Sequence, residues 1–172
     1  MTYLSNSFQI KSIEENGIFT GYANVFNVID QQSDIVKPGS FNICNPSEIK
    51  LLWQHDHTKP IGKVIEAKED NKGLYVKCAL LLTISRGKEA YNLLKSKIID
   101  GLSIGYISIK DEIREDGVRV LKKIKILEIS LVTFPSNIDA KISSVKNTNS
   151  INLDHSTLLH SLARAIRILN TN

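Results

Sequence analysis

Short runs in which apolar and polar residues alternate fill the first half of the chain. Alternation of this kind is typical of β-strands with one buried face. The predicted strands cover residues 8–13, 18–26, 51–55, 61–67 and 74–82. Residues 16–17 (Asn-Gly) predict a hairpin between the first two strands, and residues 70–73 predict a turn between the last two. Residues 27–40 form a polar loop with a turn at residues 38–39 (Pro-Gly). This half is therefore expected to be a meander of strands.

In the second half, the apolar residues first recur at intervals of three and four. This spacing predicts a helix over residues 85–99, and Gly101 is expected to stop it. Patterns typical of strands then return at residues 103–109, 118–126 and 128–134. Residues 115–117 are the predicted turn before the second of these runs, and the third is the most apolar of the chain.

The sequence turns polar after about residue 142, which predicts a linker, and a last group of apolar residues at helical spacing predicts an amphipathic helix. We therefore predict an α+β fold that is mainly β. It would be an antiparallel β-barrel, closed or nearly closed, with an internal helix and a C-terminal amphipathic helix. The domain is expected over residues 1–145, and the linker and helix over residues 146–172.

Composition adds limits to this picture. The 172 residues suit one domain with or without a tail, and the net charge of +4 comes from interspersed charges, so nucleic acid is not the expected partner. No apolar run has the length of a signal peptide core or a membrane span, which predicts a protein that stays in a cytosol-like space. Cys44 and Cys78 match no metal-ligand spacing and are expected to remain thiols.

His55 and His57 stand in a polar cluster where a predicted strand ends. If the strand continues through them, the two rings share a face and could ligate a metal, although a catalytic zinc also needs a third protein ligand. A structural or surface role and a catalytic imidazole are the alternatives.

Ser103 stands in a Gly-x-Ser-x-Gly pattern at residues 101–105. The nucleophile elbow with this pattern lies between a strand and a following helix, whereas here a helix is predicted before the serine and a strand after it. A tight helix-to-strand turn is one interpretation. The other is a serine nucleophile whose small neighbours leave the hydroxyl open to a substrate.

Glu128 opens the most apolar predicted strand. A carboxylate there must be paired or hydrogen-bonded, because an isolated buried charge is costly. Its partner would be a lysine, such as Lys122 or Lys125, or an imidazole held as the acid of a serine triad holds it.

Taken together, the ordered segments resemble the phage prohead protease family. The segments that carry the resemblance are Leu-Trp-Gln-His-Asp with Pro-Ile-Gly (residues 52–56 and 60–62), Gly-Leu-Ser-Ile-Gly-Tyr (101–106) and Leu-Glu-Ile-Ser-Leu-Val-Thr-Phe-Pro-Ser-Asn (127–137). Earlier segments add to it, namely Gly-Tyr-Ala-Asn-Val-Phe (21–26) and Asp-Ile-Val-Lys-Pro-Gly-Ser-Phe (34–41). The likeness covers roughly residues 18–142.

The resemblance implies a serine endopeptidase that matures the capsids of tailed phages, with a fold similar to the herpesvirus assembly proteases and no cofactor. His55, Ser103 and Glu128 match the family's catalytic positions, with Glu128 the least secure of the three because the herpesvirus enzymes use a second histidine there. His57 has no such match, and Ser130 and Ser136 are expected to matter mainly for packing.

The resemblance also implies partners and a location. The substrates would be the phage major capsid protein and scaffold protein, with self-cleavage, and the enzyme would be a homodimer inside the assembling procapsid in the host cytoplasm, without nucleic acid or membrane contacts. Two alternatives stay open: a non-enzymatic capsid assembly protein, and a metal-dependent hydrolase that uses His55 and His57.

Overall fold

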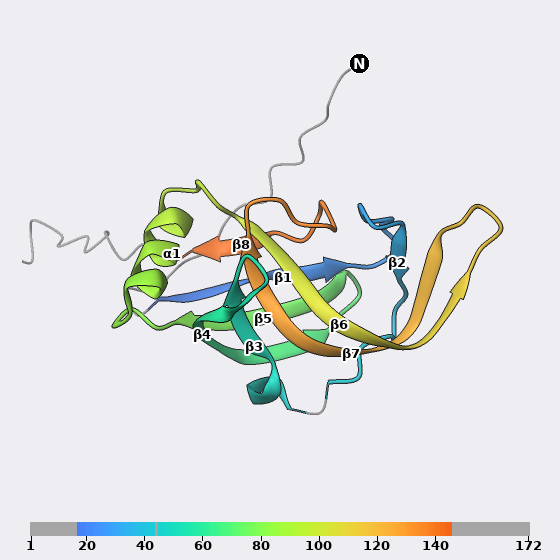
Figure 1. Cartoon of the computed structure of the whole chain (residues 1–172), viewed down its shortest axis with the longest axis horizontal. Helices are drawn as coiled ribbons and strands as arrows, with labels where there is room; N and C mark the ends of the chain where they lie inside the picture. The colour runs from blue at the N-terminus through green and yellow to red at the C-terminus, as the bar shows by residue number, and fades with distance from the viewer. Residues whose placement is uncertain (1–16, 44, 146–172) are drawn as a thin grey trace, which may run out of the picture.

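Eight strands, one α-helix and a short 3₁₀ helix make up the described part of the computed structural model, which comprises residues 17–43 and 45–145 (Figure 1). In chain order these elements are β1 (Ile18–Val25), β2 (Asp34–Val36), η1 (Pro46–Glu48), β3 (Lys50–Trp53), β4 (Asp56–Glu69), β5 (Gly73–Leu80), α1 (Ser85–Lys95), β6 (Gly101–Ile113), β7 (Arg119–Val132) and β8 (Ile142–Val145). The fold is mainly β, as the sequence predicts.

All strands belong to one sheet with the order β2-β7-β3-β4-β5-β1-β8, and β6 pairs with β7 beside this path. The long strand β7 is paired along both edges. One edge carries β6, and the other carries β2 near the start of β7 and β3 near its end. The β2–β7 and β3–β7 ladders are parallel. The described sheet is therefore mixed, and the prediction of a purely antiparallel one was wrong.

The sheet curls on itself without closing into a barrel. The starts of β6 and β8 come together through the isolated bridge between Gly101 and Lys141. Two backbone hydrogen bonds flank it, from Leu102 N to Ala140 O (2.9 Å) and from Ile142 N to Asp100 O (2.8 Å). No longer ladder joins these strands among the described residues, so the sheet is a curled half-barrel and a closed antiparallel barrel is not confirmed. The expected C-terminal helix lies outside the described residues.

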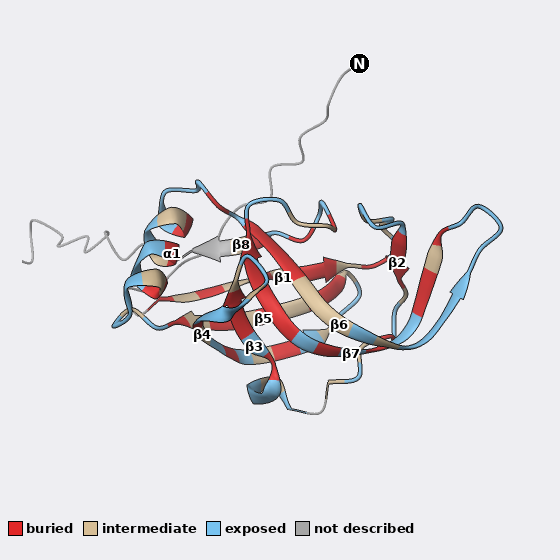
Figure 2. Ribbon diagram, in the orientation of Figure 1, coloured by how far each residue is buried: buried red, intermediate tan, exposed pale blue. Residues whose placement is uncertain are grey.

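The hydrophobic core lies inside this curl because alternate residues of the strands point inward. In β5 the residues Leu74, Val76, Cys78 and Leu80 are buried and the residues between them are only half-buried. Helix α1 covers one end of the sheet and buries the small or apolar face formed by Gly87, Ala90 and Leu94. The far part of the β6–β7 hairpin lies outside this core, and Figure 2 shows that β6 is largely exposed there. One of the functional candidates, Ser103, lies at the buried start of β6.

Helix α1 is shorter than predicted, and Gly101 does not stop it. It ends at Lys95, and Lys97 adopts a left-handed conformation with φ of 55°. Two backbone hydrogen bonds, from Lys97 N to Leu94 O and from Ile98 N to Leu93 O, complete a Schellman motif. Because a lysine fills the position where glycine is usual, no stop signal is visible there in the sequence. Gly101 instead opens β6.

Other boundaries also differ from the predictions. A short strand, β2, lies within the predicted polar loop and is held by its parallel pairing with β7. The two runs predicted at residues 118–126 and 128–134 form the single strand β7. Residues 142–145, where the sequence turns polar, form β8 on β1. The predicted strand at residues 8–13 lies outside the described residues. Within them, no helix has the length and apolar character that crossing a bilayer requires.

Candidate active site

His55 is placed by a tight turn between β3 and β4. Trp53 and Asp56 are paired, so Gln54 and His55 form a two-residue hairpin loop. Both residues have positive φ (52° and 58°), which is the type I′ geometry that usually selects Gly or Asn. A side chain in this region costs about 1–2 kcal/mol per residue. Strain of this kind is often found at functional sites.

Contacts with the end of β7 hold the turn in this conformation. Gln54 N donates to Leu131 O (3.0 Å), and the Gln54 side chain donates through Nε2 to Thr133 Oγ1 (2.8 Å). Parallel pairing of β3 with β7 brings the turn to this place, with Trp53 beside Leu131. The imidazole is thereby held over the C-terminal part of β7.

The ring of His55 meets the carboxylate of Glu128 on β7. His55 Nδ1 and Glu128 Oε1 are 2.6 Å apart, and the Glu128 side chain is only 6% exposed whereas that of His55 is 43% exposed. The hydrogen bond to Glu128 raises the pKa of His55 above its ordinary value of 6.5, although partial burial opposes it. Glu128 therefore has an imidazole as its partner. Lys122, one of the alternatives from the sequence, pairs with Glu112 instead.

Ser130 completes this cluster, and the sequence analysis missed it. Its fully buried hydroxyl donates to Glu128 Oε2 (2.6 Å) and accepts from the His55 backbone N–H (3.1 Å). Ser130 therefore does more than fill space, whereas the sequence analysis expects it to matter mainly for packing; its effect on activity stays a prediction. A signal was present in the sequence, because residues two apart on a strand share a face and Ser130 follows Glu128 at that spacing.

Ser103 lies on β6 directly opposite Ser130. It is 6% exposed and stands inside the strand, so the pattern at residues 101–105 is neither a nucleophile elbow nor a helix-to-strand turn. Residues directly opposite in an antiparallel pair project to the same face with Cβ atoms about 5 Å apart. The structure thus brings Ser103 to the face that carries Ser130 and Glu128. No hydrogen bond joins the Ser103 hydroxyl to the His55 ring within residues 17–43 and 45–145.

The two glycines of the pattern are explained by close approaches. A Cβ on Gly105 would lie 2.4 Å from Glu128 Oε1, so the carboxylate rests against the bare backbone of Gly105. A Cβ on Gly101 would lie 2.7 Å from Val132 O and 2.9 Å from the Pro135 ring. Gly105 therefore makes room for Glu128 to turn toward His55.

His57 is not brought into the cluster. The strand does not continue through residues 53–57, because the turn at Gln54 and His55 separates β3 from β4, and His57 is exposed on β4. Within the described part of the chain, no three His, Cys, Asp or Glu side chains gather as a metal-binding group. Cys78 is a buried free thiol, and Cys44 lies outside the described residues.

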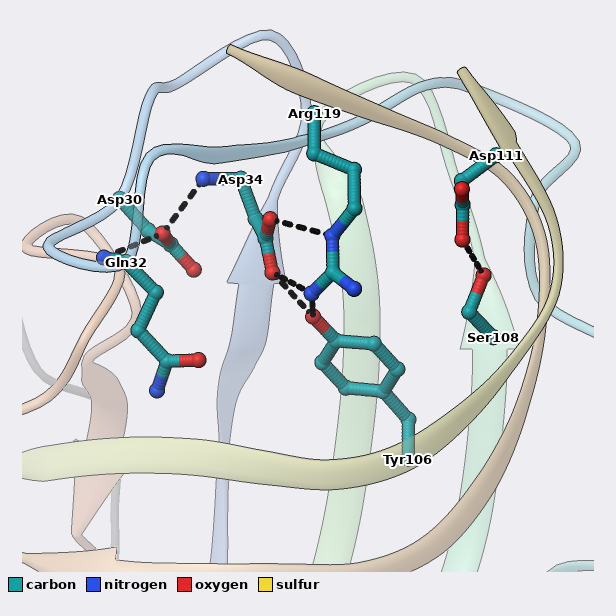
Figure 3. Close-up of polar contacts among 7 residues, drawn as sticks. All are labelled: Asp30, Gln32, Asp34, Tyr106, Ser108, Asp111 and Arg119. Carbon is teal, nitrogen blue, oxygen red and sulfur yellow. Dashed lines mark hydrogen bonds and ion pairs between the residues drawn. The ribbon is translucent and has the colours of Figure 1, made fainter. Parts of the chain in front are cut away.

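Beside Ser103 lies a small pocket of about 20 Å³, and one of its walls is stiffened by a second polar network. Figure 3 shows that Asp34 of β2 meets Arg119 of β7 and Tyr106 of β6. Arg119 Nε donates to Asp34 Oδ1 (2.8 Å), and the Tyr106 hydroxyl donates to Asp34 Oδ2 (2.5 Å). Burial by itself raises the pKa of Asp34, but these hydrogen bonds outweigh it and lower the pKa below its ordinary value. Tyr106, which also lines the pocket, is thereby fixed in place.

Comparison with known proteins agrees with the ordered set of segments. The family model of the caudovirus prohead serine protease matches residues 6–154, which is most of the chain. This chain belongs to that family. The prohead protease of Enterobacteria phage HK97 is 35% identical over 144 residues, which are 80% of this chain and 64% of that protein. The prohead protease of Escherichia phage T5 is 27% identical over 151 residues, covering 81% of this chain and 70% of that protein.

Two further similarities complete the comparison. A capsid polyprotein of Pseudomonas phage PAJU2 is 35% identical over 151 residues, which are 83% of this chain but only 22% of that protein. The chain thus spans less than two thirds of the HK97 protease and about a fifth of the polyprotein. Among solved structures, the protease of varicella-zoster virus is similar with a TM-score of 0.44 and 14% identity, over 86% of this chain and 76% of that one.

Proposed function

We propose that this chain is a serine endopeptidase with Ser103 as nucleophile, His55 as general base and Glu128 as the acid that orients the base. Membership of the prohead serine protease family supports the activity class. The observation that carries the residue assignment is the 2.6 Å contact between His55 Nδ1 and Glu128 Oε1. In this arrangement Glu128 Oε1 accepts a hydrogen bond from the Nδ1 proton of His55. Nε2 is then the nitrogen that accepts a proton from serine.

The reaction then follows from the residue types. His55 Nε2 takes the proton of Ser103 Oγ while Oγ bonds to the peptide carbonyl carbon, and the π electron pair of the carbonyl moves onto its oxygen. When this pair re-forms the carbonyl, the C–N bond breaks and the amine leaves with the proton from His55. Water then gives a proton to His55 as its oxygen bonds to the acyl carbon, the C–Oγ ester bond breaks, and Ser103 Oγ takes the proton back from His55 as the acid leaves. Glu128 stabilises the imidazolium that forms in each step.

A serine-directed probe tests the assignment without knowledge of the cleavage site. We expect a fluorophosphonate to add one adduct to the chain by intact-mass measurement, no adduct on Ser103→Ala, and strongly slowed labelling of His55→Ala. His57→Ala is the matched control and should react like the unmodified chain. Triad members act as a unit, so the Ser103→Ala, His55→Ala double variant should cleave peptides no worse than either single variant.

The opposite results point to other classes. A chain that gains no adduct and releases no product from a proteome-derived peptide library would be a non-enzymatic assembly protein. Cleavage that survives Ser103→Ala but stops with a chelator would indicate a hydrolase that uses His55 and His57 around a metal.

We further propose that the substrates are the phage scaffold protein and the major capsid protein, and that the chain also cuts itself. It would act as a homodimer inside the procapsid that assembles in the host. The similarity to a protein named capsid polyprotein supports a capsid-related substrate. Coexpression with the capsid protein should give a shortened capsid protein, detected by mass, only when Ser103 is intact. Time-dependent shortening of the chain itself should likewise disappear in Ser103→Ala.

A further inference from the structure

Phe134, in the loop that follows β7, exposes its ring to water beside the candidate site. It is 83% exposed, which is the highest value among the large hydrophobic residues that the structure describes. Neither of the aromatic ring pairs found among the described residues includes it. A folded chain gains stability from apolar groups that leave water, so this ring contributes little to the fold. Single exposed apolar residues are common, and the place of this one decides whether it matters.

Thr133, the residue before Phe134, is bonded to the turn that carries His55. Gln54 Nε2 donates to Thr133 Oγ1 (2.8 Å), and Thr133 N donates to Gln54 Oε1 (3.3 Å). Gln54 directly precedes His55 in the chain. The backbone that leads into Phe134 is therefore fixed next to the proposed general base.

Pro135, the residue after Phe134, packs on the strand that carries Ser103. A Cβ on Gly101 would lie 2.9 Å from the Pro135 ring. The β6–β7 register runs without a shift from Gly101 to Gly105, so Gly101 and Ser103 project from the same face of β6. Because a strand rises about 3.3 Å per residue, the Pro135 contact lies roughly 7 Å along β6 from Ser103. The loop therefore reaches the face of the sheet from which the proposed nucleophile projects.

The loop is also fixed beyond Pro135. Gln31 N donates to Ser136 O (3.1 Å), and the Asn137 side chain donates through Nδ2 to Val25 O (2.8 Å). Phe134 is thus presented by a backbone that is held on both sides. A ligand that packs on its ring pays little entropy for ordering this loop, and such preorganisation favours binding.

We propose that Phe134 is a specificity-determining residue whose ring packs against a large apolar side chain of the substrate peptide. This inference rests on the proposed serine mechanism, because that mechanism places the scissile bond at Ser103. An extended peptide advances by about 3.3 Å per residue, so the apolar side chain would lie within about three residues of the scissile bond. Both apolar surfaces leave water when the substrate binds. Substrates with an aliphatic or aromatic residue at that position are therefore favoured over substrates with a polar one.

Cleavage of a proteome-derived peptide library, measured by mass spectrometry, tests the proposal. The unmodified chain should cut mainly at sites with a large apolar residue at one position within three residues of the scissile bond. In Phe134→Ala this preference should be lost, and kcat/KM for a preferred peptide should fall by roughly 10–100-fold, mainly through a higher KM. In Phe134→Glu the preferred residue at the same position should become lysine or arginine.

A matched control and the melting temperature exclude an effect on the fold. Ile113, the last residue of β6, is 72% exposed and pairs with Arg119 at the far end of the hairpin. Ile113→Ala should keep the apolar preference and the kcat/KM of the unmodified chain. The Phe134 variants should keep its melting temperature, because substitutions of exposed side chains change stability little.

The ester p-nitrophenyl acetate separates peptide binding from the chemical step. Its hydrolysis needs acyl transfer to serine but no peptide side chain. Phe134→Ala should therefore lose much less activity on this ester than on a preferred peptide. Equal losses on both substrates would mean that Phe134 positions the catalytic residues, which would overturn the proposal.

Two further outcomes would contradict it. One is a library in which the unmodified chain shows no apolar preference near the scissile bond, and the other is an apolar preference that survives in Phe134→Ala. In each of these cases Ser103-dependent hydrolysis of the ester by the unmodified chain still supports the proposed function, whereas its absence removes both proposals.

Discussion

Glu128 has both carboxylate oxygens occupied, one by the His55 ring and the other by the Ser130 hydroxyl. The first contact raises the pKa of His55. A base with a raised pKa becomes available only at higher pH, so the acid limb of the pH–activity profile should lie above 6.5. Glu128 is thus expected to set the pH range of the enzyme as well as the position of its base.

Replacing Glu128 by Gln tests this directly. We expect the acid limb of kcat/KM to move to lower pH, with a smaller loss of activity than in Ser103→Ala or His55→Ala, because the amide oxygen still accepts from Nδ1. The pKa of His55 is higher in the folded chain than in the unfolded chain. The ion pair with Glu128 therefore stabilises the fold fully at pH values below the unfolded pKa, and this stabilisation is lost as pH rises through the folded pKa. The melting temperature of Glu128→Gln should therefore fall most at about pH 6 and least at about pH 9. An unchanged profile would reduce Glu128 to a structural residue.

Ser130→Ala tests the contact on the other side of the carboxylate. The substitution leaves Glu128 Oε2 and the His55 N–H without their partner, which costs about 1–3 kcal/mol of unfolding free energy. The base also loses its fixed position, so kcat/KM should fall by roughly 10–100-fold. Ser40→Ala is the matched control, since Ser40 is a buried serine that donates to Lys37 O and Leu121 O. It should lose stability and keep its activity; equal activity losses in both variants would contradict a special role for Ser130.

At the scale of elements, Gly105 of β6 can be substituted to disturb the site while the sheet still forms. In Gly105→Ala the new Cβ would lie 2.4 Å from Glu128 Oε1 and 2.8 Å from Glu128 Cγ, so the whole Glu128 side chain must move. We expect a soluble chain with a stability loss of about 1–3 kcal/mol and an activity loss of at least roughly 10-fold. The acid limb of its pH profile should shift down as in Glu128→Gln. Ile107→Ala, on the exposed part of β6, should change neither.

Most strands were predictable because they alternate and end at turn-forming residues. Strand β5 is an example: its inward residues follow period two, and the turn before it begins with Asp70, whose backbone N–H bonds to Gly73 O. The strand β2 was not predictable, because it is three residues long and exists through its parallel pairing with β7. Local patterns carry no information about such a distant partner.

The candidate site was predictable in its residues but less so in its geometry. The sequence analysis names His55, Ser103 and Glu128, and the His55–Glu128 contact is one of the alternatives that the buried carboxylate required. The turn that aims His55 was missed, since Gln54 and His55 adopt positive φ without a glycine. Contacts with β7 impose this conformation, and they are visible only in the folded chain.

For the whole molecule, β7 is the strand that assembles the site. It carries Glu128 and Ser130, it pairs with β3 along one edge to place the His55 turn, and it pairs with β6 along the other to place Ser103. These segments are distant in the sequence, so the site exists only when the curled sheet has formed. Loss of the sheet and loss of activity should therefore coincide in a thermal inactivation experiment.

This dependence leads to a prediction about the end of the chain. The described residues of the main core cluster lie between Phe19 and Ile142, and β8 ends at Val145 after pairing with β1. Residues 146–172 lie outside the described residues, and the linker and amphipathic helix expected there remain predictions. We further predict that this helix docks the chain to scaffold or capsid protein. A chain cut after Val145 should hydrolyse p-nitrophenyl acetate as the full chain does and keep its melting temperature, because the strands of the site are retained.

The same truncated chain should be recruited less well into assembling shells when it is coexpressed with its capsid protein, which quantitative mass spectrometry of purified shells would measure. The full-length Ser103→Ala variant is the control, since it should enter shells normally while cleaving nothing. A truncated chain that is insoluble, or inactive on the ester, would instead place residues 146–172 in the folded core. Normal recruitment of an active truncated chain would mean that the capsid recognises the protease domain itself.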